Sequence, residues 1–324
     1  MSVYLGIDTS NYTTSTALFD SDAWKLGQQA VKMEKELLPT ALGALGLRQS
    51  DAVFAHVQQL GGLAARLFEE GAPELSGVGV SIFPRRAEGS YMPCFLVGQM
   101  SAQLVSSAMG VPMYTFSHQE GHIAAALYSA GRLDLIKERF IAFHLSGGTT
   151  DALLVEPGEP FFKITPVARS LDLKAGQAVD RVGLMLGLKF PCGPQLTELA
   201  LRCEEKIKVR PTMKGADCCL SGIENRCQKL LDEGKAPEYI ALYCLKSIEA
   251  ALDGMTRALI EKYGELPLLY AGGVMSNVII RQQFESRYGG IFAEPQFSSD
   301  NAAGIAVLAA LAAGEDICRE RKAD

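Results

Sequence analysis

Two stretches of the chain share one pattern, in which β-rich apolar runs are joined by a small polar or glycine turn. Residues 3–19 read VYLGIDTSNYTTSTALF, and residues 139–157 read RFIAFHLSGGTTDALLVEP. Each pattern predicts a β-hairpin. Because the two stretches begin about 135 residues apart, they indicate a duplicated structural unit.

Elsewhere, apolar residues recur at helical spacing or gather in short runs. The longest helical pattern covers residues 236–263, and the alanine-rich run at 303–314 is too short to span a bilayer, so it predicts a buried helix. This mixture of helices and strands predicts an α/β fold. Further helices are expected at 51–70 and 95–109 and from residue 117, and further strands at 76–83, 111–116 and 266–273.

Composition narrows the possible functions. The 324 residues correspond to about two domains, and 31 basic against 37 acidic residues give a net charge of −6. This balance is unlike that of a free-standing nucleic-acid binder, so an RNA partner would need a local basic patch or a second protein. The eight cysteines contain no CxxC pair, and no secretory signal precedes them, so we expect reduced thiols in a cytoplasmic protein without a membrane anchor.

The segment SHQEGH places two histidines four residues apart. On a helix, His118 and His122 would project from one face, where both could bind one metal ion, although a partly exposed helix start explains the same spacing. Ser117 and Glu120 match the S-x-x-E capping box, which we favour over metal ligation by Glu120. A zinc-peptidase HExxH motif is excluded because Gln119 occupies the glutamate position.

Small polar turns suggest places where a nucleotide could bind. The turn at residues 146–150, SGGTT, could hold a phosphate because glycines let backbone amides approach an anion, although Gly-Gly hairpin turns are common. The turn at residues 8–10, DTS, is its duplicate. The Ala-Gly-Gly turn at 271–273 could admit a base or ribose, with Asn277 donating hydrogen bonds, or it could be a tight strand-to-helix turn.

Two carboxylates have ordinary structural explanations. Asp300 precedes the last predicted helix and suits its N-cap, a role that leaves one oxygen available for a ligand. Asp180 lies in a helical pattern, where a solvated surface carboxylate is the default interpretation. None of these motifs settles the function alone.

Taken in order, seven motifs resemble those of the TsaD family, the tRNA adenosine threonylcarbamoyltransferases once described as glycoproteases. The resemblance implies a duplicated actin-like fold of the sugar-kinase and Hsp70 type, with two lobes around a nucleotide cleft. We expect residues 1–120 with 300–324 to form one lobe and residues 121–299 the other. The motifs are GIDTS, SHQEGH, LSGGTT, SLDLKAGQAVDRVGLMLGLKFPCGP, LSGIEN, AGGVMSN and SSDNAAGIA.

The resemblance also implies roles for individual residues. His118, His122 and Asp300 match the ligands of a divalent metal, usually iron in the family, while the donor types alone also suit zinc or manganese. Asp8 and Ser146 are the expected catalytic residues. The positions that would bind ATP, AMP or the acyl-adenylate are His144, Leu145, Ser146, Gly147, Gly148, Asp180, Gly193 and Asn277.

Departures from the family pattern lie away from the metal positions. Two acidic residues of the first loop are replaced by Tyr12 and Thr13, and a lysine is replaced by Glu224. These changes suggest that the residues that act on the acceptor substrate differ from those of the family. Other departures are Thr149, Leu173, Lys174, Gln177, Cys192, Thr197 and the segment Pro84-Arg85-Arg86.

Three functions therefore remain open. The first is transfer of threonylcarbamoyl from threonylcarbamoyl-adenylate to adenosine 37 of tRNA, with tRNA reached through helper proteins. The second is a carbamoyl- or acyltransferase acting on another acceptor. The third is a nucleotide-binding regulatory partner without turnover, which forms a homo- or heterodimer with a family member; retention of the histidine pair argues against a pure scaffold.

Overall fold

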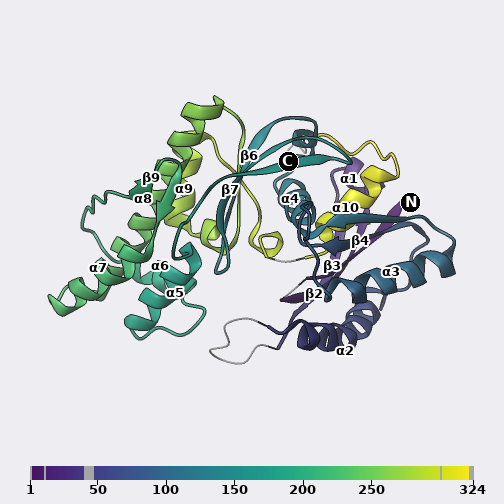
Figure 1. Cartoon of the computed structure of the whole chain (residues 1–324), viewed down its shortest axis with the longest axis horizontal. Coiled ribbons are helices and arrows are strands. Elements are labelled where there is room, and N and C mark those ends of the chain that lie inside the picture. The colour runs from purple at the N-terminus through teal and green to yellow at the C-terminus, as the bar shows by residue number, and fades with distance from the viewer. Residues whose placement is uncertain (1, 11, 40–46, 300, 321–324) are drawn as a thin grey trace. The chain divides into compact units, whose positions relative to one another are not determined.

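The computed structural model describes residues 2–10, 12–39, 47–299 and 301–320. The chain forms two compact units, one of Met1–Lys137 with Gln296–Asp324 and the other of Glu138–Pro295 (Figure 1). The first boundary thus differs from the one expected after residue 120. The reason is that helix α4 (His118–Ser129) packs along helix α10 (Ala303–Ala312), which belongs to the first unit.

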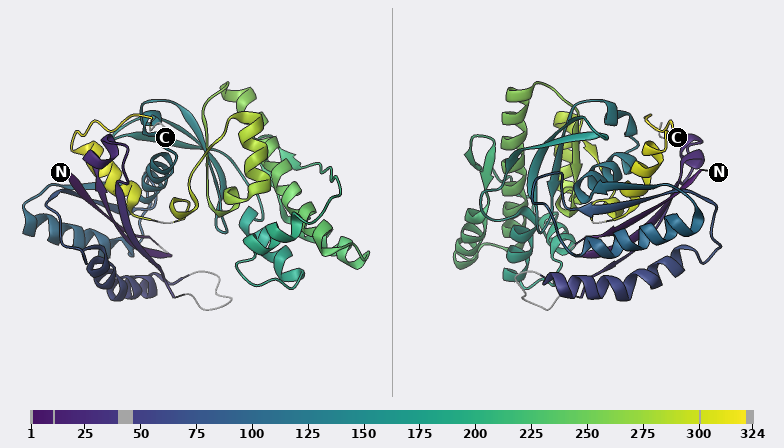
Figure 2. Two further views of the ribbon diagram at one scale, coloured as in Figure 1. Left: turned by 180° about the vertical axis from the view of Figure 1, so that it is seen from behind. Right: turned by 45° about the vertical axis from the view of Figure 1, so that its right-hand side comes forward.

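The first unit is built on a five-stranded sheet in the order β3-β2-β1-β4-β5. Strands β1, β2 and β3 are antiparallel, while β4 runs parallel to β1 and β5 parallel to β4. Helices α2 (Gln49–Leu67) and α3 (Phe95–Met109) cover one face, and α4 and α10 cover the other (Figure 2). The strands are β1 (Val3–Thr9), β2 (Thr13–Asp20), β3 (Val31–Leu37), β4 (Leu75–Phe83) and β5 (Met113–Ser117).

Helix α10 lies directly on the sheet because small residues line the contact. A Cβ atom on Gly79 would lie only 2.6 Å from the carbonyl oxygen of Ile305, and one on Gly6 would overlap the carbonyl oxygen of Ala302. On the other side of α10, a Cβ on Gly304 would overlap the carbonyl oxygen of Gly121 in α4. The alanine- and glycine-rich run is therefore the buried helix that its composition predicts.

The second unit repeats the topology of the first. Its sheet has the order β12-β11-β6-β7-β8, in which β6, β7 and β8 are antiparallel and β11 and β12 are parallel to β6. Counted along each unit, both sheets therefore read 3-2-1-4-5, which confirms the predicted duplication. The strands are β6 (Phe140–Leu145), β7 (Thr150–Pro157), β8 (Phe162–Arg169), β11 (Leu268–Ala271) and β12 (Ile291–Phe292).

Five helices and a small hairpin complete the second unit. Helix α8, expected at 236–263, spans Pro237–Tyr263 and supplies the centre of the apolar core. The hairpin pairs β9 (Thr212–Lys214) with β10 (Asp217–Cys219). The other helices are α5 (Ala175–Met185), α6 (Gly193–Ala200), α7 (Ser221–Asp232) and α9 (Val278–Tyr288).

Among the described helices, none combines the length and apolar character that a bilayer crossing requires. Short elements fill the remaining connections. These elements are α1 (Ser21–Lys25), η1 (Leu133–Lys137), η2 (Gly273–Ser276) and η3 (Pro295–Phe297).

Candidate active site

The histidine pair is placed by the N-terminus of α4. Ser117 caps this helix: its Oγ accepts the amide of Glu120 at 3.1 Å, and Oε2 of Glu120 accepts the amide of Ser117 at 2.7 Å. The predicted capping box is therefore confirmed. The helix start brings the rings of His118 and His122 together, with centroids 4.3 Å apart and ring planes at 71°.

Glu120 has a structural role beside this pair. Its side chain is buried, and Oε1 accepts a hydrogen bond from Nε of Arg86 at 2.9 Å. The amide of Gln119 donates to the carbonyl of Pro84 at 3.0 Å. The segment Pro84-Arg85-Arg86 therefore anchors the first turn of α4.

Asp8 contacts the pair from the end of β1. Its Oδ2 lies 2.7 Å from Nδ1 of His118, and the carboxylate is 1% exposed. Because a carboxylate only accepts, Nδ1 carries the proton, and a neutral ring in this tautomer has its lone pair on Nε2. The other oxygen of Asp8, Oδ1, is buried without a hydrogen-bond partner among the described residues.

Further unsatisfied polar atoms lie close to Asp8 in the sheet. Ser15 is paired with Asp8 across β1 and β2, and Ser81 follows Val80, the β4 residue that pairs with its neighbour Ile7. The hydroxyls of Ser15, Ser81 and Ser10 are buried without a partner in the part of the chain that the structure describes. Buried polar atoms usually have partners, so this group has the character of a binding site for a polar ligand.

The donor chemistry at this place fits a divalent cation. Two imidazoles and carboxylate oxygens suit iron, zinc or manganese, and an orphaned buried carboxylate oxygen favours a positive charge nearby. Within residues 2–10, 12–39, 47–299 and 301–320, no group of three such side chains is arranged to hold a metal. The third expected ligand, Asp300, lies outside the described residues.

His56 in α2 is a residue of this region that the sequence motifs did not single out. Its side chain is fully buried, and Nδ1 lies 2.7 Å from Oγ1 of Thr14. The Thr14 hydroxyl donates to Oε1 of Gln59 at 2.6 Å, since the Gln59 amide nitrogen donates to Glu36 and Leu37. The hydroxyl has one proton, so Nδ1 of His56 must donate to it.

The environment of His56 favours its neutral form. Burial lowers the pKa of His56, against the opposing effects of the Ser10 carbonyl and the Asp8 charge. The burial of this histidine followed from tertiary packing of α2, which the sequence pattern alone did not reveal.

The second unit presents the predicted phosphate turn between β6 and β7. The Ser146 amide donates to the carbonyl of Thr149 at 2.8 Å, and Ser146 Oγ accepts the amides of Gly148 and Thr149 at 3.3 and 3.1 Å. A Cβ at Gly147 or Gly148 would meet no atom within 4 Å. The space beside both α-carbons is therefore open, while the Gly148 amide already bonds to Ser146. Phosphate binding by this turn stays a prediction.

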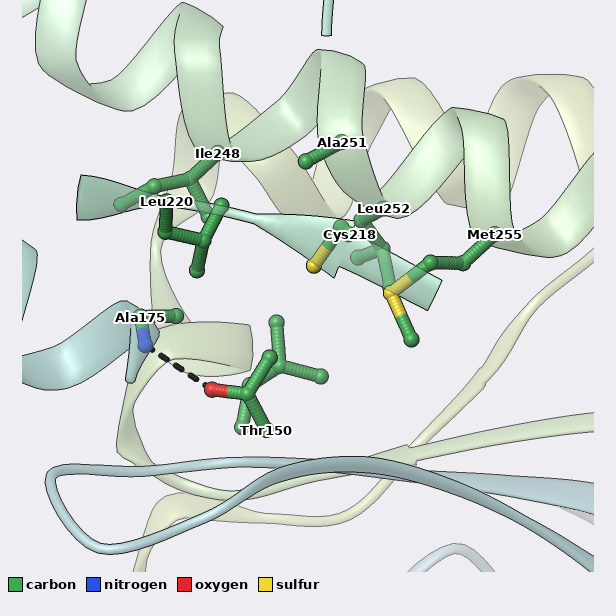
Figure 3. A pocket seen from close by; sticks show the side chains of 9 residues that line it. Thr150, Ala175, Cys218, Leu220, Ile248, Ala251, Leu252 and Met255 are labelled. Atoms are coloured by element: carbon green, nitrogen blue, oxygen red, sulfur yellow. Dashed lines mark hydrogen bonds between the residues drawn. The ribbon is translucent and has the colours of Figure 1, made fainter. Parts of the chain in front are cut away.

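Helix α5 holds this turn through two of its first backbone amides. The Gly176 amide donates to the Ser146 carbonyl at 3.1 Å, and the Ala175 amide donates to Oγ1 of Thr150 at 2.8 Å (Figure 3). A Cβ at Gly176 would lie 2.5 Å from the Gly147 nitrogen. Because these first helical amides bond to protein oxygens, α5 positions the turn and does not bind an anion through them.

His144 and Leu145 lead into the turn on the last two positions of β6. Leu145 is buried and lines a small apolar pocket together with the α8 side chains that Figure 3 labels, Ile248, Ala251, Leu252 and Met255. His144 is half-buried and pairs in register with Ala271 of β11 and Asp151 of β7. The two residues alternate between the faces of the sheet, so only His144 lies on the face opposite this apolar layer.

The turn after β11 touches the same hairpin. Gly272 has φ +98°, and a Cβ there would overlap the carbonyl oxygen of Leu145, whereas Gly273 has open space around it. Asn277 caps α9 by accepting the amides of Ile279 and Ile280 at 3.0 and 3.3 Å. The Ala-Gly-Gly turn is therefore a strand-to-helix connection that also contacts the candidate phosphate turn.

Asn277 joins two of the other predicted positions. Its Nδ2 donates to Oγ1 of Thr197 at 2.7 Å, and this hydroxyl donates to the carbonyl of Gly193 at 2.7 Å. Asp180 is held separately, because its Oδ1 accepts the amide of Cys192 at 2.9 Å. Asp180 is thus bonded to the start of α6 and is not a purely solvated carboxylate.

The chain is similar in sequence and in fold to known proteins. A family model described as TsaD, tRNA N6-adenosine threonylcarbamoyltransferase, matches residues 46–307. Component A of the (R)-2-hydroxyglutaryl-CoA dehydratase of Acidaminococcus fermentans has 14% identity and a TM-score of 0.55, covering 97% of this chain and 100% of that one.

Two further solved structures have the same fold. The activator of the 2-hydroxyisocaproyl-CoA dehydratase from Clostridium difficile, with bound ADPNP, has 15% identity and a TM-score of 0.51, covering 97% and 96% of the two chains. Full-length HypF in a phosphate- and nucleotide-bound form has 12% identity and a TM-score of 0.55, covering 98% of this chain; the match spans 55% of HypF. The duplicated actin-like fold is therefore confirmed.

Proposed function

Because the family match covers most of the chain, the protein belongs to the TsaD family, and we propose that it passes a threonylcarbamoyl group from threonylcarbamoyl-adenylate to adenosine 37 of tRNA. The observation that carries this proposal is the contact of Asp8 with His118 beside His122, with one buried carboxylate oxygen unsatisfied among the described residues. This arrangement supports a site that is still able to bind a metal ion, and not one that has lost this ability.

In this proposal, His118, His122 and Asp300 hold a divalent cation, with iron as the expected metal. A bound cation would supply electrophilic stabilisation of the charge that develops on the transferred group. Asp8 acts through His118: by accepting the Nδ1 proton it fixes the orientation and tautomer of the ring and raises the basicity of the other nitrogen.

The second unit supplies the nucleotide contacts in the proposal. The phosphate lies in the open space beside the α-carbons of Gly147 and Gly148, with the Ser146 hydroxyl as a donor. Asp180, Gly193 and Asn277 surround the nucleoside part. Their hydrogen bonds to α6 and α9 keep these positions fixed before the ligand arrives, which lowers the entropy cost of binding.

The test supplies purified protein with threonylcarbamoyl-adenylate, unmodified tRNA and the usual helper proteins, and measures threonylcarbamoyladenosine by mass spectrometry. We expect product from the wild-type protein and none from a His118→Ala, His122→Ala double variant. Absence of product under conditions in which an established family member modifies the same tRNA would reject the proposal.

A second candidate function is transfer to a different acceptor. Glu224, where the family has a lysine, forms an exposed ion pair with Arg181 at 2.8 Å, so both charges are neutralised. If tRNA is the acceptor, Glu224→Lys should raise the rate of tRNA modification. If the acceptor is different, Glu224→Lys should leave tRNA unmodified, while the wild-type protein still protects the adenylate from hydrolysis.

A further inference from the structure

An extended segment before and within β9 alternates regularly between exposed and half-buried residues. Residues 206–214, KIKVRPTMK, expose every even-numbered side chain and partly bury every odd-numbered one. This two-residue period is that of an extended chain, in which alternate side chains lie about 7 Å apart on one face. The exposed face carries Lys206, Lys208, Arg210 and Lys214, which we name the cationic strip.

Packing fixes which face of the segment points outward. Ile207 and Met213 pack against the apolar core of the second unit, and β9 lies against α8 (Figure 1). A Cβ at Gly254 of α8 would lie 2.9 Å from Sδ of Met213, so this glycine makes room for the methionine. With the apolar side chains held on the core, the cations must face solvent.

The cationic strip forms no close ion pair within the described residues, and only Lys214 has a carboxylate residue, Asp217, opposite it in register. None of its four side chains has a carboxylate within 4.0 Å, whereas many other basic residues of the chain are paired. Glu204 and Glu205 precede the strip, and Asp217 in the paired strand β10 accepts the Arg169 amide at 2.8 Å. Within residues 204–217 four cations outnumber three carboxylates, so this segment is locally positive although the whole chain carries a net charge of −6.

Protection of a sheet edge does not explain this arrangement. Lysines on exposed edge strands prevent unwanted strand pairing. However, β9 covers only Thr212–Lys214, and Lys206, Lys208 and Arg210 lie before it, where the structure assigns no strand. Three of the four cations therefore need another reason for their position.

We propose that the cationic strip binds the phosphate backbone of RNA, the acceptor in the function proposed above, on which this inference rests. A linear row of exposed cations complements a linear row of phosphates, and arginine can bind a phosphate through two parallel hydrogen bonds. An anionic membrane fits less well, because membrane-surface segments also present apolar side chains outward, and here those side chains face the core.

The test compares two triple variants that remove the same charge from the second unit. Lys206→Gln, Lys208→Gln, Arg210→Gln alters the strip, while Lys229→Gln, Lys235→Gln, Lys262→Gln alters exposed lysines of α7, α8 and the loop between them. Binding of fluorescent tRNA is measured against salt concentration without any adenylate donor. For the strip variant we expect affinity to fall at least about tenfold and the slope of log K against log salt to fall by about two to three, with little change in the control.

Several outcomes would overturn the proposal. The wild-type protein could fail to bind tRNA at low salt, or both triple variants could lose the same amount of tRNA affinity. The protein could also bind anionic phosphatidylserine vesicles and not tRNA. If the strip variant aggregates, ultraviolet crosslinking of wild-type protein to tRNA decides, because crosslinks outside residues 202–216 reject the strip. Strip-dependent binding without modified adenosine would reject the proposed transfer alone, since binding is measured without the donor.

Discussion

Asp8 at the end of β1 lies 2.7 Å from Nδ1 of His118, the first residue of α4. The two residues are 110 positions apart in the sequence. This contact connects the first hairpin motif to the histidine motif through one hydrogen bond, and it determines which ring nitrogen of His118 carries a proton.

The first prediction concerns that bond. Asp8→Asn keeps the shape of the side chain but removes its charge, so the His118 ring becomes less basic. We expect affinity for Fe²⁺ or Zn²⁺ to fall about 10- to 100-fold, measured by titration with the metal. The control Asp51→Asn removes an exposed carboxylate of α2, and equal losses in the two variants would contradict the positioning role.

A second prediction compares two adjacent glycines after β11. Gly272→Ala places a Cβ against the Leu145 carbonyl at a positive φ, whereas Gly273→Ala meets open space. We expect Gly272→Ala to lower the free energy of unfolding by at least about 1 kcal/mol and to weaken AMP binding by displacing the phosphate turn. Denaturant titration measures the free energy of unfolding, and calorimetry measures AMP binding. Equal values for the Gly272→Ala and Gly273→Ala variants would contradict this prediction.

The third prediction concerns Asp172, which ties the segment before α5 to the start of α7. Burial raises its pKa, but hydrogen bonds from Ser221, Leu220 and Leu173 outweigh this effect, so the pKa lies below its usual value. A depressed carboxylate pKa stabilises the fold above the unfolded-state pKa, and this stability is lost as pH falls through the folded-state pKa.

Asp172→Asn should therefore cost about 1 kcal/mol near pH 7, a value typical of a lost helix cap. The difference from the wild-type protein should shrink as pH falls below 4, the region of the ordinary carboxyl pKa. Urea unfolding at a series of pH values measures this difference, and a gap that widens in acid would refute the assignment.

The fourth prediction uses the buried His56. Burial lowers its pKa from the ordinary value of 6.5, so the folded protein binds a proton here less readily than the unfolded chain does. Stability should therefore fall as pH drops below 6.5. His56→Gln, which can still donate to Thr14, should show a shallower decline in melting temperature between pH 7 and 5; parallel curves would exclude this histidine as a cause.

Much of the fold followed from local patterns in the sequence. The hairpins, the long helix α8 and the buried helix α10 were readable because periodicity and side-chain size report directly on local structure. The first domain boundary was misplaced, since the packing of α4 on α10 depends on contacts between Gly121 and Gly304 that no local pattern reveals.

The candidate site was predictable in its motifs but not in its contacts. The spacing of His118 and His122 predicted a shared face, whereas the approach of Asp8 and the burial of His56 required the tertiary fold. The sequence KIKVRPTMK contains the cationic strip, but the net charge of the whole chain does not reveal it. Asp300 lies outside the described residues, so its role as a ligand stays a prediction.

The close contact between Gly121 and Gly304 joins two helices, α4 and α10, that the ribosome synthesises at different times. The first unit is discontinuous, and the helix that covers one face of its sheet emerges from the ribosome only after the whole second unit. Until then the helix that bears the two histidines lacks the surface on which it rests. We therefore expect this polar centre to form only after the second unit and α10 have both been synthesised.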